Sequence, residues 1–159
     1  RDVKYSDIFK EVEAQFEKDK LSKKSIQFRM KNTIDEDSSY VTIDDSRIKQ
    51  VLINLIGNSY KFTSVGYIEA HCGINKNGDL EFYVKDTGIG LSEEHKSQIF
   101  NRFTKAELSK QKLYRGAGLG LSICKSLVEV LGGKIWVETE LSKGSIFYIS
   151  LPLSIEKIN

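Results

Sequence analysis

Apolar residues recur along this chain with two spacings, one typical of helices and one typical of strands. The clearest helical spacing has apolar residues at i, i+3, i+4, i+7 and i+8, which predicts one broad buried face. Those residues are Ile48, Val51, Leu52, Leu55 and Ile56. An earlier helix, which Ser6 can cap, is predicted by Ile8, Val12 and Phe16. A later helix, closed by a Gly-Gly pair, is predicted by Leu119, Ile123, Leu127 and Val130.

Alternation of apolar and polar residues predicts the strands. The clearest case is a hairpin, in which one strand runs from Ile68 to Ile74 and the return strand from Leu80 to Val84. The sequence Asn-Lys-Asn-Gly at 75–78 supplies the turn between them. Further strands are predicted around 26–30, 40–43, 135–139 and 145–151. Helices and antiparallel-rich strands in this mixed order predict a two-layer α/β sandwich.

Composition narrows the class of protein. The length of 159 residues fits one domain over 1–159, and 40% hydrophobic with 29% charged residues is ordinary for a soluble globular protein. A net charge of +2, with the lysines spread along the chain, does not indicate nucleic-acid binding. Cys72 and Cys124 show no metal-ligand spacing, so we expect buried reduced thiols and a cytosolic setting. The chain opens at Arg1 without a methionine, which indicates a fragment of a longer protein.

A polar stripe runs beside the apolar face of the helix predicted at 48–56. Asn54, Asn58 and Lys61 occupy positions i, i+4 and i+7, so at about 100° per residue they lie within about 60° of one another. Two amides and an ammonium in line can hold a hydrated cation and a polyphosphate, and amide oxygen is a hard ligand that suits Mg²⁺. Taken alone, such a stripe is more typical of a solvated helix face.

The strand at 80–84 continues by the same alternation into Asp86, which places this carboxylate on the apolar side of the sheet. A buried carboxylate is costly unless it accepts strong hydrogen bonds. The exocyclic amine of adenine is such a donor, and the glycines of Thr87-Gly88-Ile89-Gly90 let a ligand approach the backbone closely. The alternative is a turn with an Asx-type bond, which is common for Asp-x-Gly.

Glycine alternates with other residues where the last helix begins, in Arg115-Gly-Ala-Gly-Leu-Gly-Leu-Ser122. A helix N-terminus is a natural phosphate site, because it offers free N–H groups and a positive dipole end. The motif matches neither the dinucleotide-binding fingerprint, since no strand precedes it, nor a phosphate-binding loop ending in Gly-Lys-Ser/Thr. Before it, residues 104–118 lack periodicity and are long for a connection, which predicts a flexible lid.

Four motifs occur in one order along the chain. They are Asn54-Leu-Ile-Gly-Asn58-Ser-Tyr-Lys61-Phe-Thr63, Asp86-Thr-Gly-Ile-Gly90, Ile99-Phe-Asn-Arg-Phe103 and Gly116-Ala-Gly-Leu-Gly120. In this order they resemble the N, G1, F and G2 boxes of the histidine kinase catalytic domain. That domain belongs to the GHKL superfamily, with DNA gyrase, a heat-shock chaperone and a mismatch-repair protein. The resemblance spans essentially the whole chain and implies a mixed, mostly antiparallel sheet covered on one face by about three helices.

The resemblance also implies a site for ATP and Mg²⁺. By position, Asp86 reads adenine beside Gly88 and Gly90, and Asn58 is the Mg²⁺ ligand with Asn54 and Lys61 near the phosphates. The lid hinge and further phosphate contacts would come from Gly116, Gly118, Leu119 and Gly120. Related kinases often carry a basic lid residue that meets the γ-phosphate where this chain has Lys105. The implied catalytic residues are Asn54, Lys61 and Lys105.

Two departures from the family pattern are small. Ser59 stands where alanine is usual, and Ala117 stands where threonine is frequent. Neither substitution removes a functional group on which the implied site depends. Phe100 and Phe103 are expected to anchor the base of the lid and not to touch the nucleotide.

The residue at position 54 distinguishes ATP hydrolysis from phosphoryl transfer to a protein. Hydrolysing relatives typically carry a glutamate at this position that activates water, and an amide cannot accept a proton from water. The sequence therefore favours transfer of the γ-phosphoryl group to a histidine on a separate dimerisation domain, as in two-component signal transduction. The chain has only His71 and His95, and neither lies in a His-Glu-x-x-Thr-Pro-like helix. The acceptor is therefore expected elsewhere in the same parent protein.

The implied partners are that dimerisation and phosphotransfer domain and, downstream, a response regulator, with no nucleic acid. The chain itself has no apolar run of the roughly 20 residues that cross a bilayer. We expect a cytoplasmic domain whose parent protein is anchored in the inner or plasma membrane. Two alternatives stay open. One is an anti-sigma-like serine kinase, which usually has the glutamate that Asn54 replaces, and the other is a non-catalytic nucleotide-binding scaffold, against which the intact motifs argue.

Overall fold

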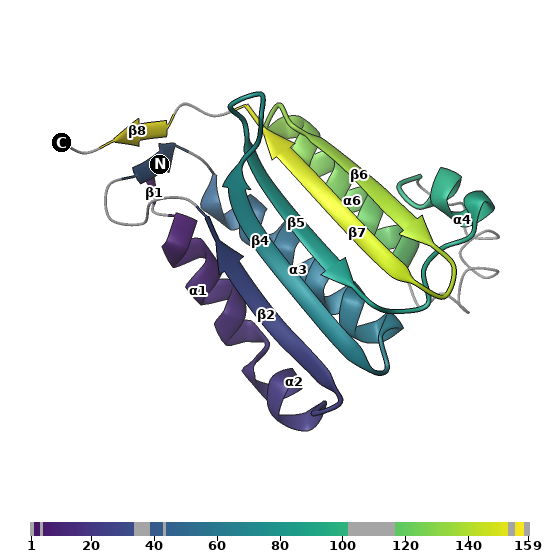
Figure 1. Cartoon of the computed structure of the whole chain (residues 1–159). Helices are drawn as coiled ribbons and strands as arrows, with labels where there is room; N and C mark the ends of the chain where they lie inside the picture. The colour runs from purple at the N-terminus through teal and green to yellow at the C-terminus, as the bar shows by residue number, and fades with distance from the viewer. Residues whose placement is uncertain are drawn as a thin grey trace.

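The computed structural model describes residues 2–3, 5–33, 39–42, 44–101, 117–152 and 155–157. One layer is a five-stranded sheet in the order β2-β4-β5-β7-β6 (Figure 1). Its strands are β2 (Ile26–Asn32), β4 (Gly66–Ile74), β5 (Leu80–Asp86), β6 (Lys134–Glu140) and β7 (Gly144–Leu151). Only β2 and β4 pair in parallel. The predicted mixed, mostly antiparallel sheet is therefore confirmed.

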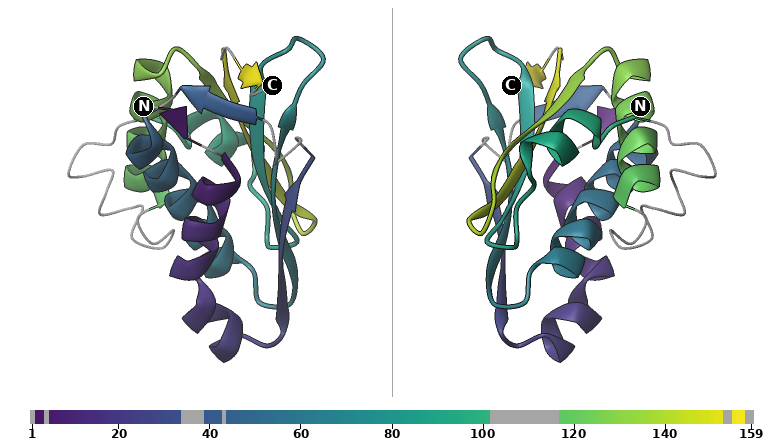
Figure 2. Two further views of the ribbon diagram at one scale, coloured as in Figure 1. Left: turned by 90° about the vertical axis from the view of Figure 1, so that its left-hand side faces the viewer. Right: turned by 90° about the vertical axis from the view of Figure 1, so that its right-hand side faces the viewer.

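Helices form the second layer. They are α1 (Tyr5–Gln15), α2 (Glu17–Ser22), α3 (Asp45–Phe62), α4 (Glu93–Gln98) and α6 (Ala117–Val130). Seen edge-on, α1, α3 and α6 lie together against one face of the sheet, and none of the described helices covers the other face (Figure 2). The predicted two-layer sandwich with about three covering helices is confirmed. None of the described helices combines the length and apolar character that crossing a membrane requires.

A second, smaller sheet lies beside the first. Its order is β1-β3-β8, and both pairings are antiparallel. The strands are β1 (Asp2–Val3), β3 (Ser39–Thr42) and β8 (Ile155–Lys157). A strand at 40–43 was predicted, whereas β1 and β8 were not, because segments of two or three residues are too short to show alternation. Segments near both ends of the sequence thus pair with the same strand.

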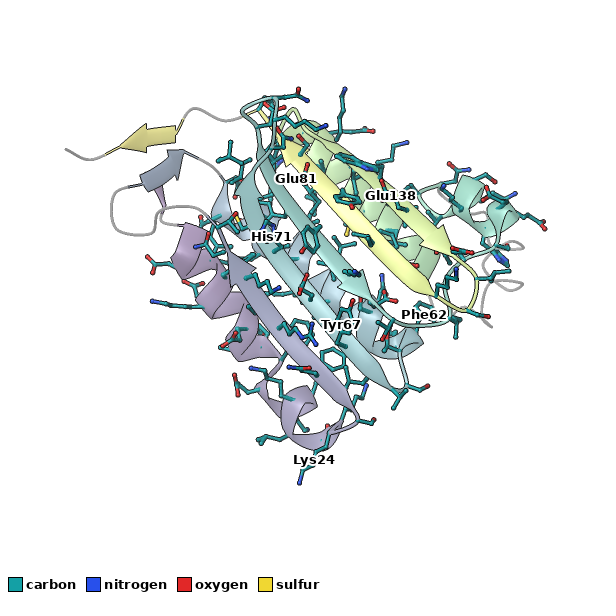
Figure 3. The ribbon with its side chains drawn as sticks, in the orientation of Figure 1. Lys24, Phe62, Tyr67, His71, Glu81 and Glu138 are labelled. Carbon is teal, nitrogen blue, oxygen red and sulfur yellow. The ribbon has the colours of Figure 1, made fainter. Side chains whose placement is uncertain are left out.

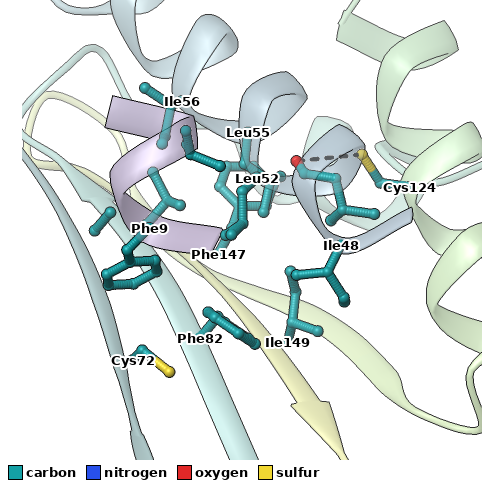
Figure 4. Packing of buried hydrophobic residues seen from close by; sticks show 14 of the residues in the cluster. Phe9, Ile48, Leu52, Leu55, Ile56, Cys72, Phe82, Cys124, Phe147 and Ile149 are labelled. Atoms are coloured by element: carbon teal, nitrogen blue, oxygen red, sulfur yellow. Dashed lines mark hydrogen bonds between the residues drawn. The ribbon is translucent and has the colours of Figure 1, made fainter. Parts of the chain in front are cut away.

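The core lies between α3 and the central strands. The five apolar residues predicted for the buried face of α3 are all fully buried, which confirms that face. They pack on side chains of β5 and β7, among them Phe82, Phe147 and Ile149 (Figure 4). Asp44 caps the helix by accepting a hydrogen bond from the backbone N–H of Arg47. The core therefore fixes the rotation of α3, and with it the direction of the polar residues on the same helix.

The predicted helix is confirmed as α6, but its buried face is not the apolar stripe from which it was predicted. Its buried side chains are Leu121, Cys124 and Val128. Ile123 is 46% exposed and Val130 is 67% exposed, while the side chain of Leu119 is outside the described part of the chain. This helix carries apolar residues on two sides at helical spacing, so periodicity alone cannot choose between them. The packing of α6 against α3 determines which of the two stripes is buried.

The sheet face opposite the described helices carries a row of aromatic rings. Tyr67, His71 and Glu81 lie on this face (Figure 3). The ring of His71 stacks on Tyr83 at 4.7 Å between centroids, and Tyr148 stacks on Trp136 at 5.2 Å. Cross-strand ring pairs of this kind stabilise a sheet that has one face in water. His71 points outward as predicted, but it is half-buried in this stack.

Candidate nucleotide-binding site

Asp86 ends β5 on the face that packs against the helices, as the alternation predicted, and is only 6% exposed. Its Oδ1 accepts the backbone N–H of Gly88 at 2.9 Å, and its Oδ2 accepts the hydroxyl of Ser59 at 3.1 Å. The backbone of Ser145 donates a further hydrogen bond. Burial raises the pKa of Asp86 above its ordinary value, and these three hydrogen bonds oppose the rise. The Asx-type bond and a ligand are compatible, because each carboxylate oxygen has two acceptor sites.

The glycines after Asp86 are required by close packing of the backbone. A Cβ on Gly88 would lie 2.4 Å from the carbonyl oxygen of Phe62, at the end of α3 (Figure 3). Gly90 has φ of +69°, and a Cβ there would lie 2.1 Å from the carbonyl oxygen of Glu140. Ile89 also donates its backbone N–H to Phe62 at 3.2 Å. The loop after β5 is thereby held between the end of α3 and the β6–β7 turn.

The two asparagines of the polar stripe on α3 face α6. Asn54 is half-buried and donates from Nδ2 to the Cys124 sulfur at 3.7 Å. Asn58 is buried, and a Cβ on Gly120 would lie 3.9 Å from its Nδ2 atom. Lys61, in the last turn of α3, is exposed. A solvated helix face is therefore wrong for the two asparagines, which lie between α3 and the first turns of α6.

Two buried polar atoms near this stripe lack a hydrogen-bond partner among the described residues. They are Nδ2 of Asn58 and Oγ1 of Thr63. Leaving such a group unpaired costs roughly 1–3 kcal/mol, so functional sites are where unpaired groups persist. Since Nδ2 of Asn58 has no hydrogen-bond partner among the described residues, turning the amide to present its oxygen breaks no bond of this nitrogen. Asn58 therefore fits the predicted role of a cation ligand.

The structure describes only part of the predicted lid and of the glycine-rich motif that follows it. Gly118, Leu119 and Gly120 lie in the first turn of α6, as expected for a helix N-terminus. The predicted lid at 104–118 overlaps this helix, because α6 begins at Ala117. Lys105 and Gly116, with Phe103 and the remainder of the lid at 104–116, lie outside the described residues. Phe100 is described, and its ring meets Phe147 edge-on at 6.2 Å, as expected for a residue anchored on the core.

Ser59 and Thr63 were given no role from the sequence. Ser59 stood out only as a departure from the usual alanine, and the structure shows that this departure adds a hydroxyl bonded to Asp86. Thr63 follows the last residue of α3 and is buried there. The two residues are separated from Asp86 by more than twenty positions, so only the packing of α3 on β5 brings them near it.

The chain belongs to the family of histidine kinase-, DNA gyrase B- and HSP90-like ATPases, which it matches over residues 43–155. It is 42% identical over 135 residues to the autoinducer 2 sensor kinase/phosphatase LuxQ of Vibrio vulnificus, covering 82% of this chain and 16% of that protein. It is 45% identical over 112 residues to the sensor protein SrrB of Staphylococcus aureus, covering 70% of this chain and 19% of that protein. The chain thus spans less than a fifth of the length of these relatives.

Solved structures give the same result for the fold. The catalytic domain of the histidine kinase ThkA superposes with a TM-score of 0.77 and 30% identity, covering 96% of each chain. Full-length ShkA in complex with AMPPNP superposes with a TM-score of 0.82 and 26% identity, covering 99% of this chain and 32% of that one. The fold implied by the four ordered motifs is thereby confirmed as that of histidine kinase catalytic domains.

Proposed function

We propose that this chain is the ATP-binding catalytic domain of a sensor histidine kinase. In this role it transfers the γ-phosphoryl group of ATP to a histidine on a separate dimerisation domain of the same parent protein. The observation that carries the proposal is the arrangement of Asp86 and Asn58. Asp86 is a buried carboxylate with acceptor sites still available, and Asn58 is a buried amide whose Nδ2 has no hydrogen-bond partner among the described residues. The hydrogen bond from Ser59, the neighbour of Asn58 on α3, links the two. The carboxylate is complementary to the adenine of ATP, and the amide is complementary to Mg²⁺ bound to its phosphates.

Adenine would bind at the Asp86 end. Its exocyclic amine donates to the carboxylate, whose remaining acceptor sites are set by the bonds from Gly88 and Ser59. A guanine ring has a carbonyl oxygen at that position, which would face the carboxylate with no proton between the two oxygens. The site should therefore prefer adenine nucleotides.

The phosphates would bind between α3 and the start of α6. Asn58 supplies an amide oxygen to Mg²⁺, and Asn54 and Lys61 lie on the same side of α3. When bound, Mg²⁺ neutralises charge on the phosphate oxygens. Gly118, Leu119 and Gly120 would offer N–H groups at the N-terminus of α6. Lys105 and Gly116 remain part of the proposal as lid residues that reach the γ-phosphate and allow closure.

Transfer to a protein is favoured over hydrolysis by Asn54. Its amide is held by the Cys124 sulfur on α6 and has no basicity with which to activate water. A neutral imidazole of the acceptor needs no such activation, because its nitrogen already has a lone pair. The chain then has to orient the γ-phosphoryl group and stabilise its charge.

The acceptor domain would dock on the outer stripe of α6, which we define as Ile123, Leu127 and Val130. These residues follow i, i+4 and i+7, two of them are exposed, and Leu127 is half-buried. The stripe continues from the helix end that would hold the phosphates, so a domain bound there lies next to the γ-phosphoryl group.

One similar structure is a complex of the histidine kinase ThkA with the response regulator TrrA. A response regulator is accordingly the proposed downstream partner of the parent protein, which we place in a membrane with this domain in the cytoplasm.

The function is tested by phosphotransfer between separate domains. This chain, incubated with γ-labelled ATP, is expected to bind nucleotide without labelling itself. Adding the dimerisation domain of the parent protein should place acid-labile label on that domain. Acid-stable label would instead indicate a serine kinase, and nucleotide binding without any label would indicate a scaffold. Label on the chain itself that disappears in a variant carrying His71→Gln and His95→Gln would contradict the proposal.

A second prediction concerns the outer stripe of α6. Ile123→Ser is expected to slow phosphotransfer to the added domain roughly tenfold at subsaturating concentrations, because burying an isoleucine contributes about 1.5–3 kcal/mol. ATP affinity should be unchanged, since the side chain points away from α3. Lys125→Ser, on the same helix, is the matched control and should leave the rate close to wild type. Equal effects of the two substitutions would place the docking surface elsewhere.

A further inference from the structure

Ser59 is one of the two residues that depart from the family pattern, and it lies beside the candidate adenine-reading carboxylate. It follows Asn58 directly on α3 and is 2% exposed. Its hydroxyl donates to Oδ2 of Asp86 at 3.1 Å, across 27 positions of sequence. A buried hydroxyl bonded to a buried carboxylate is a specific contact, because both groups lose water when the site folds.

We propose that Ser59 is a positioning residue for adenine recognition, whose hydroxyl fixes the orientation of the Asp86 carboxylate toward the exocyclic amine. This inference rests on the proposed function, in which Asp86 reads adenine. An alanine at this position would leave Oδ2 without that donor. The chain would then hold its adenine-reading carboxylate by fewer bonds.

The carboxylate is held at both of its oxygens by different parts of the fold. Gly88, in the loop after β5, donates to Oδ1, and Ser59, on α3, donates to Oδ2. Two bonds from two directions oppose rotation of the carboxylate about its terminal torsion. A group fixed in its bound orientation loses less conformational entropy when the ligand arrives. Among the described residues, removing Ser59 leaves Gly88 and the backbone of Ser145 to hold Asp86.

The same hydroxyl favours the ionised form of Asp86. Burial raises the pKa of this carboxyl, and the opposing groups are three neutral donors, Gly88, Ser59 and Ser145, with no ionised side chain among them. A protonated carboxyl presents a hydrogen on one oxygen, so it is a poorer acceptor for the adenine amine. ATP affinity should therefore fall as the pH falls through the pKa of Asp86. Loss of the Ser59 hydroxyl raises that pKa further, so the decline should begin at a higher pH.

Ser59 also connects the two ends of the site. Asn58 and Ser59 are consecutive on α3, so they point about 100° apart around the helix. Asn58 faces α6, and Ser59 faces the end of β5. A single residue step along α3 thus joins the cation ligand to the residue that holds the adenine-reading carboxylate.

The test compares two nucleotides in one variant. Purine riboside triphosphate lacks only the exocyclic amine of ATP, so its binding should not depend on the contact that Ser59 prepares. Ser59→Ala is expected to lower ATP affinity by about tenfold, the scale of one lost hydrogen bond to a charged group, and purine riboside triphosphate affinity by less than about twofold. The pH below which ATP affinity declines should move upward. Calorimetry over a pH series measures both effects.

The control and the outcomes separate this inference from the function on which it rests. Ser97→Ala removes an exposed hydroxyl bonded within α4 and should change neither affinity. Partial unfolding of Ser59→Ala would weaken both nucleotides equally, which would contradict the inference. Wild-type protein that binds ATP and purine riboside triphosphate equally would overturn the adenine role of Asp86. Wild-type discrimination that survives unchanged in Ser59→Ala, at every pH, would overturn the role of Ser59 alone.

Discussion

Asn58→Ala is expected to slow phosphotransfer to an added histidine domain by about 100-fold, the usual scale for removing one group that stabilises transition-state charge. It should also reduce the increase in ATP affinity that Mg²⁺ produces. The fold should survive, because the substitution removes a buried amide whose Nδ2 has no partner among the described residues. Alanine also favours the helix more than asparagine does. We therefore expect a melting temperature equal to or above that of the wild type.

The measurements for Asn58→Ala are ATP affinity with and without Mg²⁺, phosphotransfer rate, and thermal melting. Asn77→Ala, in the β4–β5 turn, is the matched control and should preserve the Mg²⁺ effect, since that side chain is exposed and remote from α3. If Asn58→Ala keeps the full Mg²⁺ effect on affinity, the cation is held by other groups and the site assignment is wrong.

Asp86→Asn is expected to weaken every adenine nucleotide by roughly 10- to 100-fold, the range for losing a hydrogen bond to a charged acceptor. The new amide can still accept from Gly88 through its oxygen. Its NH₂ group would then point at Ser59 and at the adenine amine, which are both donors in the wild type. The preference for ATP over GTP should therefore shrink with the affinity for ATP.

The two substitutions should separate the two ends of the nucleotide. Asp86→Asn should keep most of the Mg²⁺ effect that Asn58→Ala loses, since the carboxylate and the amide act on different parts of ATP. Calorimetry with ATP, ADP and GTP, each with and without Mg²⁺, gives the comparison. Asp79→Asn, beside the β4–β5 turn, controls for the loss of one negative charge. Undiminished ATP affinity in Asp86→Asn would remove Asp86 from the adenine role.

The spacing of residues in the sequence was sufficient to predict which side of an element is buried where a single apolar stripe fits that spacing. Alternation along β5 placed Asp86 on the buried side, and helical spacing placed Asn54 and Asn58 on one stripe of α3. On α6 two apolar stripes have similar spacing, and the one from which the helix was predicted, through Ile123, is the more exposed. Only contact with α3 distinguishes them, and that contact is a property of the assembled fold.

Interactions between distant segments could not be read from the sequence. The bond between Ser59 and Asp86 joins a helix to a strand across 27 positions, and β1 and β8 pair with β3 although each is only a few residues long. The same limit applies to Oγ1 of Thr63, which lacks a hydrogen-bond partner in the described part of the chain and lies against Gly88 in the loop after β5. The single-domain assignment over 1–159, the flexible lid and the role of Lys105 stay predictions.

The aromatic row also provides a built-in optical reporter. Trp136 is the single tryptophan of the chain, and it stacks on Tyr148 on the sheet face opposite the helices. Its fluorescence emission should therefore change when the sheet unfolds and stay nearly constant when a nucleotide binds on the helix side. Denaturant titrations followed at this one chromophore, with and without ATP, would give the folding free energy of each variant separately from its ligand affinity. No added dye or label is needed.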